Sequence, residues 1–154
     1  VFQNPEDQLV YSTVEEDVAF GLENLELDTN EISKAVAKTL KKLKIQHLAK
    51  QNVNTLSLGQ KQLVALAGIL AMNPKYIVFD EPTTNLDEKN KKNIMNIIKE
   101  LNKKNKITII LVTNALTDLK YADNAVILKN GSILFNGKKS KLSSKMLKGA
   151  GLYD

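Results

Sequence analysis

Cysteine and arginine are both missing from this chain of 154 residues. Without cysteine, the protein can form neither a disulfide framework nor a thiolate site. Without arginine, all 22 basic residues are lysines, and the formal net charge is +5. A basic chain can bind nucleic acid, but these lysines are spread through every segment and the side chain preferred for reading guanine is absent. Aromatic residues for base stacking are also scarce, at 5%. We therefore expect no nucleic-acid partner.

Long hydrophobic runs are absent as well. The longest, LVALAGILAM at residues 63–72, has about half the length that a membrane-spanning helix needs. Hydrophobic residues make up 43% of the chain and charged residues 25%, which is ordinary for a globular protein. The chain is therefore long enough, and apolar enough, for one domain with a hydrophobic core.

The hydrophobic pattern changes at Pro74. Before it, capping residues and apolar positions at helical spacing predict three helices, at residues 12–25, 28–45 and 57–72. After it, continuous apolar runs predict strands that alternate with helices. The expected elements are a strand at 76–80, a helix at 88–105, a strand at 107–113, a short helix at 115–122, a strand at 124–129, and a further strand after a hairpin turn at Asn130-Gly131.

This order of elements predicts an α/β fold. Strand, helix and strand in succession form a crossover unit with parallel strands. The strand at 76–80, YIVFD, does not alternate between apolar and polar residues, so we expect it to be buried on both faces. Ligands of such sheets bind beyond the carboxyl ends of the strands. Asp80, Glu81 and Asn114 fall at those ends.

Two adjacent acids, Asp80 and Glu81, end the first of these strands. Adjacent carboxylates at such a place suit a metal ion and an activated water. They could also do no more than close the strand at a turn. In nucleotide hydrolysis such acids need a phosphate-binding loop beside them.

The stretch SLGQ, at residues 57–60, begins a predicted helix. Ser57 and Gln60 have the spacing of a capping box, in which each side chain bonds the backbone amide of the other. A helix start that carries a serine and Gly59 is also suited to an anion, because free amides lie there at the positive end of the helix dipole. From these residues alone, both interpretations stay open.

A phosphate loop of the form G-x-x-x-x-G-K-[ST] is missing. The nearest match, GSILFNGKKS at residues 131–140, has one residue too many between its glycines. Lys139 stands where a hydroxyl residue should follow the lysine, and the interior of the stretch is strand-like. It therefore cannot supply the exposed backbone amides that hold phosphates.

Five ordered stretches resemble the ATP-binding subunits of ABC transporters. They are similar to the Q-loop, signature, Walker B, D-loop and H-loop regions of that family, and they read VFQNP, LSLGQKQ, YIVFDEPT, NLD and ILVTN. The segment QNPEDQLVYSTVEEDVAFGLENLELD further resembles the ATPases of energy-coupling factor importers, which include cobalt and vitamin transporters.

The resemblance implies a P-loop NTPase, with a RecA-like parallel sheet preceded by the ABC helical subdomain. Residues 1–73 would hold the Q-loop and the helical subdomain with its signature motif. Residues 74–154 would form the C-terminal half of the α/β core. In this family the phosphate loop lies before the Q-loop, so we expect the chain to be an N-terminally truncated fragment that does not bind ATP well by itself.

The resemblance also assigns roles to the acids and to a glutamine. Asp80 matches the Walker B aspartate that holds Mg²⁺, and Glu81 matches the glutamate that polarises the attacking water. Gln3 matches the Q-loop glutamine, which contacts the metal or the water. ATP and Mg²⁺ are the implied cofactors.

A second set of matches concerns an ATP molecule held by another subunit. Ser57, Gly59 and Gln60 match the signature that contacts its γ-phosphate. Leu58 stands where the family usually has glycine, and we expect it to be tolerated, since the start of a helix requires no positive φ. Asp87 matches the D-loop aspartate, and it can also cap the helix that follows.

Asn114 is the most consequential departure from the motifs of the ABC transporter ATPases, because that family has its switch histidine at this position. The resemblance implies an ATPase that energises import of a metal ion or a vitamin. It would lie peripherally at the cytoplasmic face of the membrane, with a second ATPase subunit and a transmembrane coupling subunit as partners. Asn114 and Leu58 leave open a non-hydrolysing partner subunit. A soluble ABC-type ATPase of DNA repair or translation is a further alternative.

Overall fold

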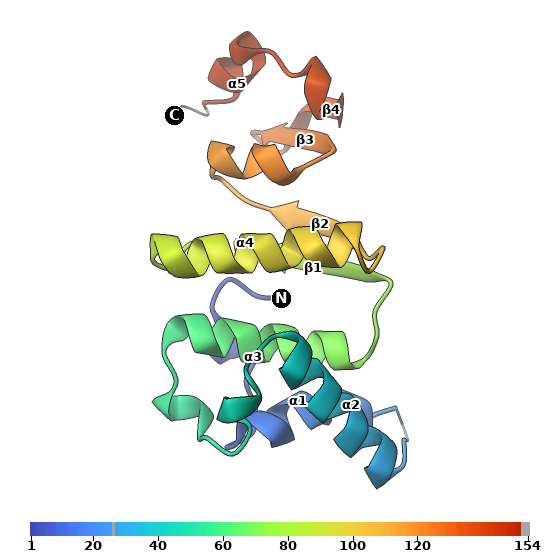
Figure 1. Ribbon diagram of the computed structural model, residues 1–154. Coiled ribbons are helices and arrows are strands. Elements are labelled where there is room, and N and C mark those ends of the chain that lie inside the picture. Colours follow the sequence, from blue (N-terminus) through green and yellow to red (C-terminus); the bar gives the residue numbers. More distant parts are fainter. Residues whose placement is uncertain (26, 152–154) are drawn as a thin grey trace. The chain divides into compact units, whose positions relative to one another are not determined.

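The computed structural model describes residues 1–25 and 27–151 (Figure 1). They form two compact units, Val1–Val112 and Thr113–Asp154, and each is described here by itself. The first unit contains η1 (Pro5–Asp7), α1 (Val14–Glu23), α2 (Thr29–Lys42), η2 (Gln46–Leu48), η3 (Val53–Thr55), α3 (Leu58–Ala71), β1 (Tyr76–Asp80), α4 (Glu88–Lys103) and β2 (Thr108–Val112). The second contains η4 (Leu116–Tyr121), β3 (Asn124–Lys129), β4 (Ser132–Lys138), η5 (Lys139–Lys141) and α5 (Ser144–Ala150).

The helices α1, α2 and α3 pack against one another and bury a common core. Val14 and Val18 of α1 and Val64 of α3 have no exposed surface. The helix α3 is apolar on most of its faces, and a helix of that kind is stable only where neighbours surround it. These three helices confirm the prediction for the region before Pro74.

The strands β1 and β2 pair in parallel, with Tyr76 opposite Thr108 and Asp80 opposite Val112. The helix α4 connects them and lies alongside the pair in Figure 1. Its buried side chains share one face of the helix, and they are Ile94, Met95, Ile98 and Leu101. The predicted strand–helix–strand unit with parallel strands is therefore confirmed.

The prediction that β1 is buried on both faces is wrong. Ile77 and Phe79 are 3% and 1% exposed, whereas Tyr76 and Val78 are 70% and 51% exposed. The strand thus alternates in burial although its residues do not alternate in polarity. The physical reason is that the described residues cover one face of the strand pair and leave the other open. An apolar run shows that a face can be buried, and does not show what covers it.

The first residue of the chain also pairs with β1. The α-amino group of Val1 donates to the carbonyl oxygen of Val78 at 2.7 Å, and the Asp80 amide donates to the Val1 carbonyl oxygen at 2.9 Å. This pairing brings the residues that follow Val1 to the carboxyl end of β1.

In the second unit, β3 and β4 form an antiparallel hairpin. The turn residues Asn130 and Gly131 have φ values of 50° and 74°, which is the left-handed conformation that a tight hairpin turn requires. The predicted hairpin is therefore confirmed, and the predicted short helix is the 3-10 helix η4. Across the described ranges of both units, no helix is both long and apolar enough to cross a membrane.

Candidate functional site

The backbone turns sharply where the chain leaves β1. Glu81 directly follows the strand and has a φ of 41°, which is uncommon for a residue other than glycine. Its amide donates to the carbonyl oxygen of Val112 at 2.9 Å, and its own carbonyl oxygen accepts from the Thr84 amide at 3.3 Å. The end of β2 and the following turn therefore hold Glu81 in a strained conformation, as is common at functional sites.

The Glu81 carboxylate is held by two donors. Its Oε2 accepts from Gln3 Nε2 at 3.1 Å and from Thr84 Oγ1 at 2.9 Å. Gln3 and Glu81, matched to different motifs, are thus in direct contact across 78 sequence positions. Thr84 was not singled out from the sequence, although a hydroxyl three residues after an acid is a local signal for such a contact. With Oε2 occupied by these donors, Oε1 remains as an acceptor for a water molecule.

Asp80 is the exposed last residue of β1, directly before Glu81. Among the described residues, no three histidine, cysteine, aspartate or glutamate side chains gather into a group that could hold a metal ion. Mg²⁺ needs no such group, because it usually binds one or two carboxylates together with waters and substrate phosphates. The carboxylate of Asp80 and the amide oxygen of Gln3 are donors of the right chemistry, so these residues fit Mg²⁺.

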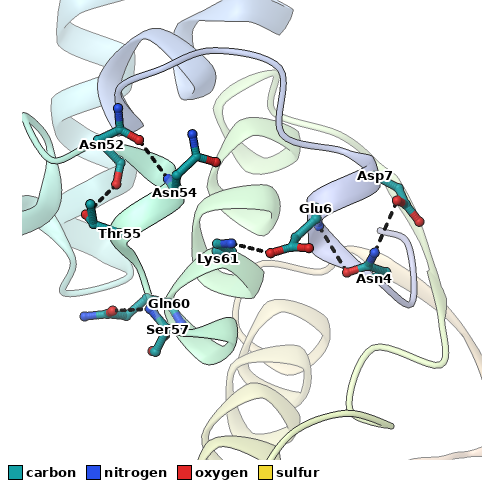
Figure 2. A network of polar contacts seen from close by, with 9 residues as sticks. All are labelled: Asn4, Glu6, Asp7, Asn52, Asn54, Thr55, Ser57, Gln60 and Lys61. Carbon is teal, nitrogen blue, oxygen red and sulfur yellow. Dashed lines mark hydrogen bonds and ion pairs between the residues drawn. The ribbon is translucent and has the colours of Figure 1, made fainter.

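An ion pair and a hydrogen bond connect the segment that carries Gln3 to α3 (Figure 2). The Lys61 ammonium of α3 forms an ion pair with the Glu6 carboxylate of η1. Gln62, which is 1% exposed, donates from Nε2 to the Phe2 carbonyl oxygen at 3.3 Å. The position of Gln3 therefore depends on α3 as well as on β1.

The start of α3 contains the predicted capping box. The Ser57 amide donates to Gln60 Oε1 at 2.9 Å (Figure 2), and the Gln60 amide donates to Ser57 Oγ at 3.4 Å. Leu58 is the first residue of the helix and is half-buried. The structural interpretation of Ser57 and Gln60 is confirmed, while their role toward an anion stays a prediction.

The start of α4 lies against the start of α3. Asp87 caps α4, and its carboxylate accepts from the Asn90 amide at 2.9 Å and from Asn90 Nδ2 at 2.6 Å. The hydrogen bond from the Asn90 amide is the largest cause that lowers the pKa of Asp87, followed by that from the Asn90 side chain. A Cβ on Gly59 would lie 2.7 Å from Cγ of Asn90, closer than real Cβ contacts. The structure thus brings Gly59 and Asp87 to the same residue, Asn90, which was not singled out from the sequence.

Asn114 belongs to the second unit and is exposed in the turn before η4. The turn is closed by Thr113, whose Oγ1 accepts from the Ala115 amide at 3.1 Å and donates to Asp118 Oδ2 at 2.8 Å. Asp118 is 3% exposed, so a buried carboxylate fixes this turn. A shared site for Asn114 and Glu81, which lies in the first unit, stays a prediction.

Known proteins match this chain along most of its length. The family model described as "ABC transporter" matches residues 1–84. The "Energy-coupling factor transporter ATP-binding protein EcfA1" of Clostridium novyi (strain NT) is 45% identical across 99% of this chain and 55% of its own length. The chain therefore spans about half the length of this curated relative.

Two solved structures have a similar fold. The cbiO1 protein of Clostridium perfringens, described as part of the ABC transporter complex cbiONQ, has a TM-score of 0.84 and 39% identity over 92% of this chain and 57% of its own. The ATP-binding cassette MJ0796, a dimer in a post-hydrolysis state bound to ADP and Pi, has a TM-score of 0.75 and 29% identity over 90% of this chain and 62% of its own. Together with the family model, which matches more than half of the residues, these likenesses show that the chain belongs to the ABC transporter family.

Proposed function

We propose that this chain is part of the ATP-hydrolysing subunit of an energy-coupling factor type importer. The observation that carries the proposal is the arrangement at the end of β1, where Gln3 and Thr84 hold the Glu81 carboxylate beside Asp80. Phosphoryl transfer needs mostly positioning and electrostatic stabilisation, and this arrangement can supply both.

Each residue of the arrangement has a distinct task. Glu81 accepts a hydrogen bond from the attacking water and orients it, with its carboxylate kept in place by Gln3 and Thr84. Asp80 and Gln3 would hold Mg²⁺, which when bound neutralises charge on the phosphates. The left-handed conformation of Glu81 turns the chain directly after Asp80, at the carboxyl end of the strand.

The starts of α3 and α4 would act on a second ATP. In this proposal Ser57, Gly59 and Gln60 contact the γ-phosphate of an ATP that another subunit holds. The position of these residues at the start of α3 supports this, because the positive end of a helix dipole attracts an anion. The dimeric, ADP-bound state of a structurally similar cassette supports pairing with a second ATPase subunit.

An exposed apolar patch supports a transmembrane partner. It consists of Val10, Tyr11 and Phe20, which are 66%, 40% and 40% exposed, and the rings of Tyr11 and Phe20 lie 5.6 Å apart. The buried Asp17 carboxylate accepts from the amides of Val10 and Tyr11, at 2.7 and 3.0 Å, and so fixes the patch. We propose that a transmembrane subunit covers it, which places the protein at the cytoplasmic face of the membrane. A metal ion or a vitamin as cargo follows from the resemblance to importers of those substrates.

A chimera tests the proposal directly. In this chimera, residues 1–154 replace the aligned part of the Clostridium novyi relative, whose own length is about twice as great. We expect the chimera to hydrolyse ATP, and Glu81→Gln to lower the rate by about a hundredfold while ATP binding is retained. The matched control is Glu23→Gln, which neutralises an exposed acid at the end of α1. Equal rates for the chimera and its Glu81→Gln variant would overturn the assignment.

The 154-residue chain alone is expected to bind Mg-ATP weakly, because it contains no G-x-x-x-x-G-K-[ST] loop to hold the phosphates. Isothermal titration calorimetry of this chain with Mg-ATP measures the affinity. Micromolar binding would show that this chain holds the nucleotide in some other way.

A second candidate is a partner subunit that binds ATP but hydrolyses it slowly, and Asn114 favours it. An asparagine amide can donate to a phosphate oxygen but cannot carry a positive charge or exchange a proton as histidine does near neutral pH. In the chimera, Asn114→His should then raise hydrolysis by about tenfold or more. An unchanged rate, together with loss of activity in Glu81→Gln, would show that an asparagine at position 114 supports ATP hydrolysis as well as a histidine does.

A further inference from the structure

Asn90 occupies the junction between the starts of α3 and α4. It is the third residue of α4 and is half-buried. A Cβ built on Gly59 would lie 2.7 Å from Asn90 Cγ, 2.9 Å from Oδ1 and 3.0 Å from Nδ2. All three outer atoms of the asparagine side chain therefore lie against the backbone of α3, at a place where only glycine leaves room for them.

The same side chain fixes the Asp87 carboxylate. In the capping box of α3, the side chain of Gln60 accepts from the backbone amide of the capping residue Ser57. At α4 the side chain of Asn90 instead donates to the carboxylate of the capping residue, while its backbone amide donates to the other oxygen. Both oxygens of Asp87 are thus bound by one residue, which limits the rotation of the carboxylate.

These two contacts join three residues in a row. Gly59 leaves room for the Asn90 side chain, and the Asn90 side chain donates a hydrogen bond to the Asp87 carboxylate. We propose that Asn90 is a positioning residue that sets the Asp87 carboxylate relative to the start of α3. It would thereby keep the signature and D-loop residues in one arrangement toward a nucleotide on a second subunit. The proposal rests on the proposed function for that last step, while the coupling between Gly59 and Asp87 is a property of this chain alone.

An ordinary capping role predicts something different. A residue that only satisfies the helix start would affect the stability of α4, and a change at Gly59 on α3 would leave Asp87 untouched. If Asn90 couples the two helices, a methyl group at Gly59 must displace the Asn90 side chain and so weaken its hydrogen bond to Asp87. The decisive measurement is therefore whether a substitution at Gly59 in α3 alters the hydrogen bonding of the Asp87 carboxylate.

The first experiment measures the pKa of Asp87 in the 154-residue chain by carboxyl-carbon NMR. Asn90→Ala should raise this pKa toward its ordinary value, because one of the hydrogen bonds that lower it is removed. Gly59→Ala should raise it as well, although position 59 lies on another helix. The control Asn93→Ala, at an exposed position one turn further along α4, should leave it unchanged. An Asp87 pKa that does not respond to Gly59→Ala would overturn the coupling.

A double variant covers the case in which Gly59→Ala does not fold. Asn90→Ala removes the atoms that a Cβ at position 59 would meet, so Gly59→Ala combined with Asn90→Ala should fold and unfold at the temperature of Asn90→Ala alone. Failure of the double variant to fold would show that another contact makes Gly59 necessary, and would overturn the proposal.

The second experiment uses the chimera and separates kcat from KM. With Asn90→Ala, a displaced Asp87 should lower kcat by about tenfold, while KM for ATP and the unfolding temperature change little. The double variant should recover stability relative to Gly59→Ala but keep the low kcat. A normal kcat in Asn90→Ala would overturn the positioning role. An inactive unmodified chimera would instead refute the proposed function and leave the pKa result standing.

Discussion

The helices α1–α3 and the strand pair β1–β2 use their apolar residues differently. Val18 and Val64 in the helices have no exposed surface, because three helices enclose one core. In the strand pair, Val78 and Ile110 are 51% and 53% exposed. The helical region therefore derives its stability from contacts within itself, whereas the strand pair carries the candidate site at its carboxyl end and has one open face. Substitutions of equally apolar residues should therefore change the free energy of unfolding by very different amounts in the two regions.

The largest effect is expected in the core of the helical region. Leu66 of α3 is 1% exposed, so Leu66→Ala leaves a cavity that the surrounding helices cannot fill. The free energy of unfolding should fall by about 2–5 kcal/mol. Urea denaturation of the 154-residue chain measures this change, with the exposed Leu128→Ala in β3 as the control. A loss no greater than that of the control would contradict the comparison.

The local structure of the helical region could be predicted from the sequence because its signals are short-range. Ser57 and Gln60 lie one helical turn apart, and their capping box needs only that turn. Asp28 caps α2 by the same device, since its Oδ1 accepts from the Glu31 amide at 2.8 Å. The hairpin at Asn130-Gly131 likewise follows from the conformations that these two residues adopt readily.

The open face of β1, the conformation of Glu81 and the contacts of Asn90 could not be predicted from the sequence. These features depend on contacts between segments that are distant in the sequence. The apolar run of β1 does not reveal that one face of the strand stays open. The left-handed conformation of Glu81 depends on its bond to Val112, which β2 supplies. Asn90 is one of several asparagines in a lysine-rich helix, and its approach to Gly59 on another helix is a contact between distant segments. The resemblance to a family assigned roles to Gln3 and Glu81 but gave no contact between them.

A smaller loss is expected where a buried polar group supports the helical region. Asp17 is 8% exposed and accepts from the amides of Val10 and Tyr11. Asp17→Ala leaves both amides without this acceptor, which should cost about 1–3 kcal/mol. Asp17→Asn keeps an oxygen acceptor of the same shape and should cost less. Hydrogen exchange provides a second measurement, since the Val10 and Tyr11 amides should exchange faster in Asp17→Ala. Equal losses in the two variants would mean that the hydrogen bonds are not the cause.

The start of α3 should tolerate change better than its core. Ser57→Ala removes the acceptor of the Gln60 amide and should lower the free energy of unfolding by about 1 kcal/mol. Ser57→Asp retains an acceptor at the positive end of the helix and should restore stability. Thermal unfolding followed by circular dichroism compares the two. If Ser57→Asp restores stability but the same change in the chimera abolishes ATP hydrolysis, the capping and nucleotide roles of this position are separated.

The smallest effect is expected on the open face of β1, where two neighbouring residues form a matched pair. Ile77 is 3% exposed and Val78 is 51% exposed, and both lie in the same strand. Ile77→Thr places a hydroxyl in the core and should cost about 1–3 kcal/mol. Val78→Thr keeps the branched shape that suits a strand and changes a side chain already in water, so the cost should stay within about 0.5 kcal/mol. Urea denaturation of the 154-residue chain measures both. A large loss in Val78→Thr would show that the face is covered in solution, by a second copy or by residues of this chain, and the contrast between the strand pair and the helices would then disappear.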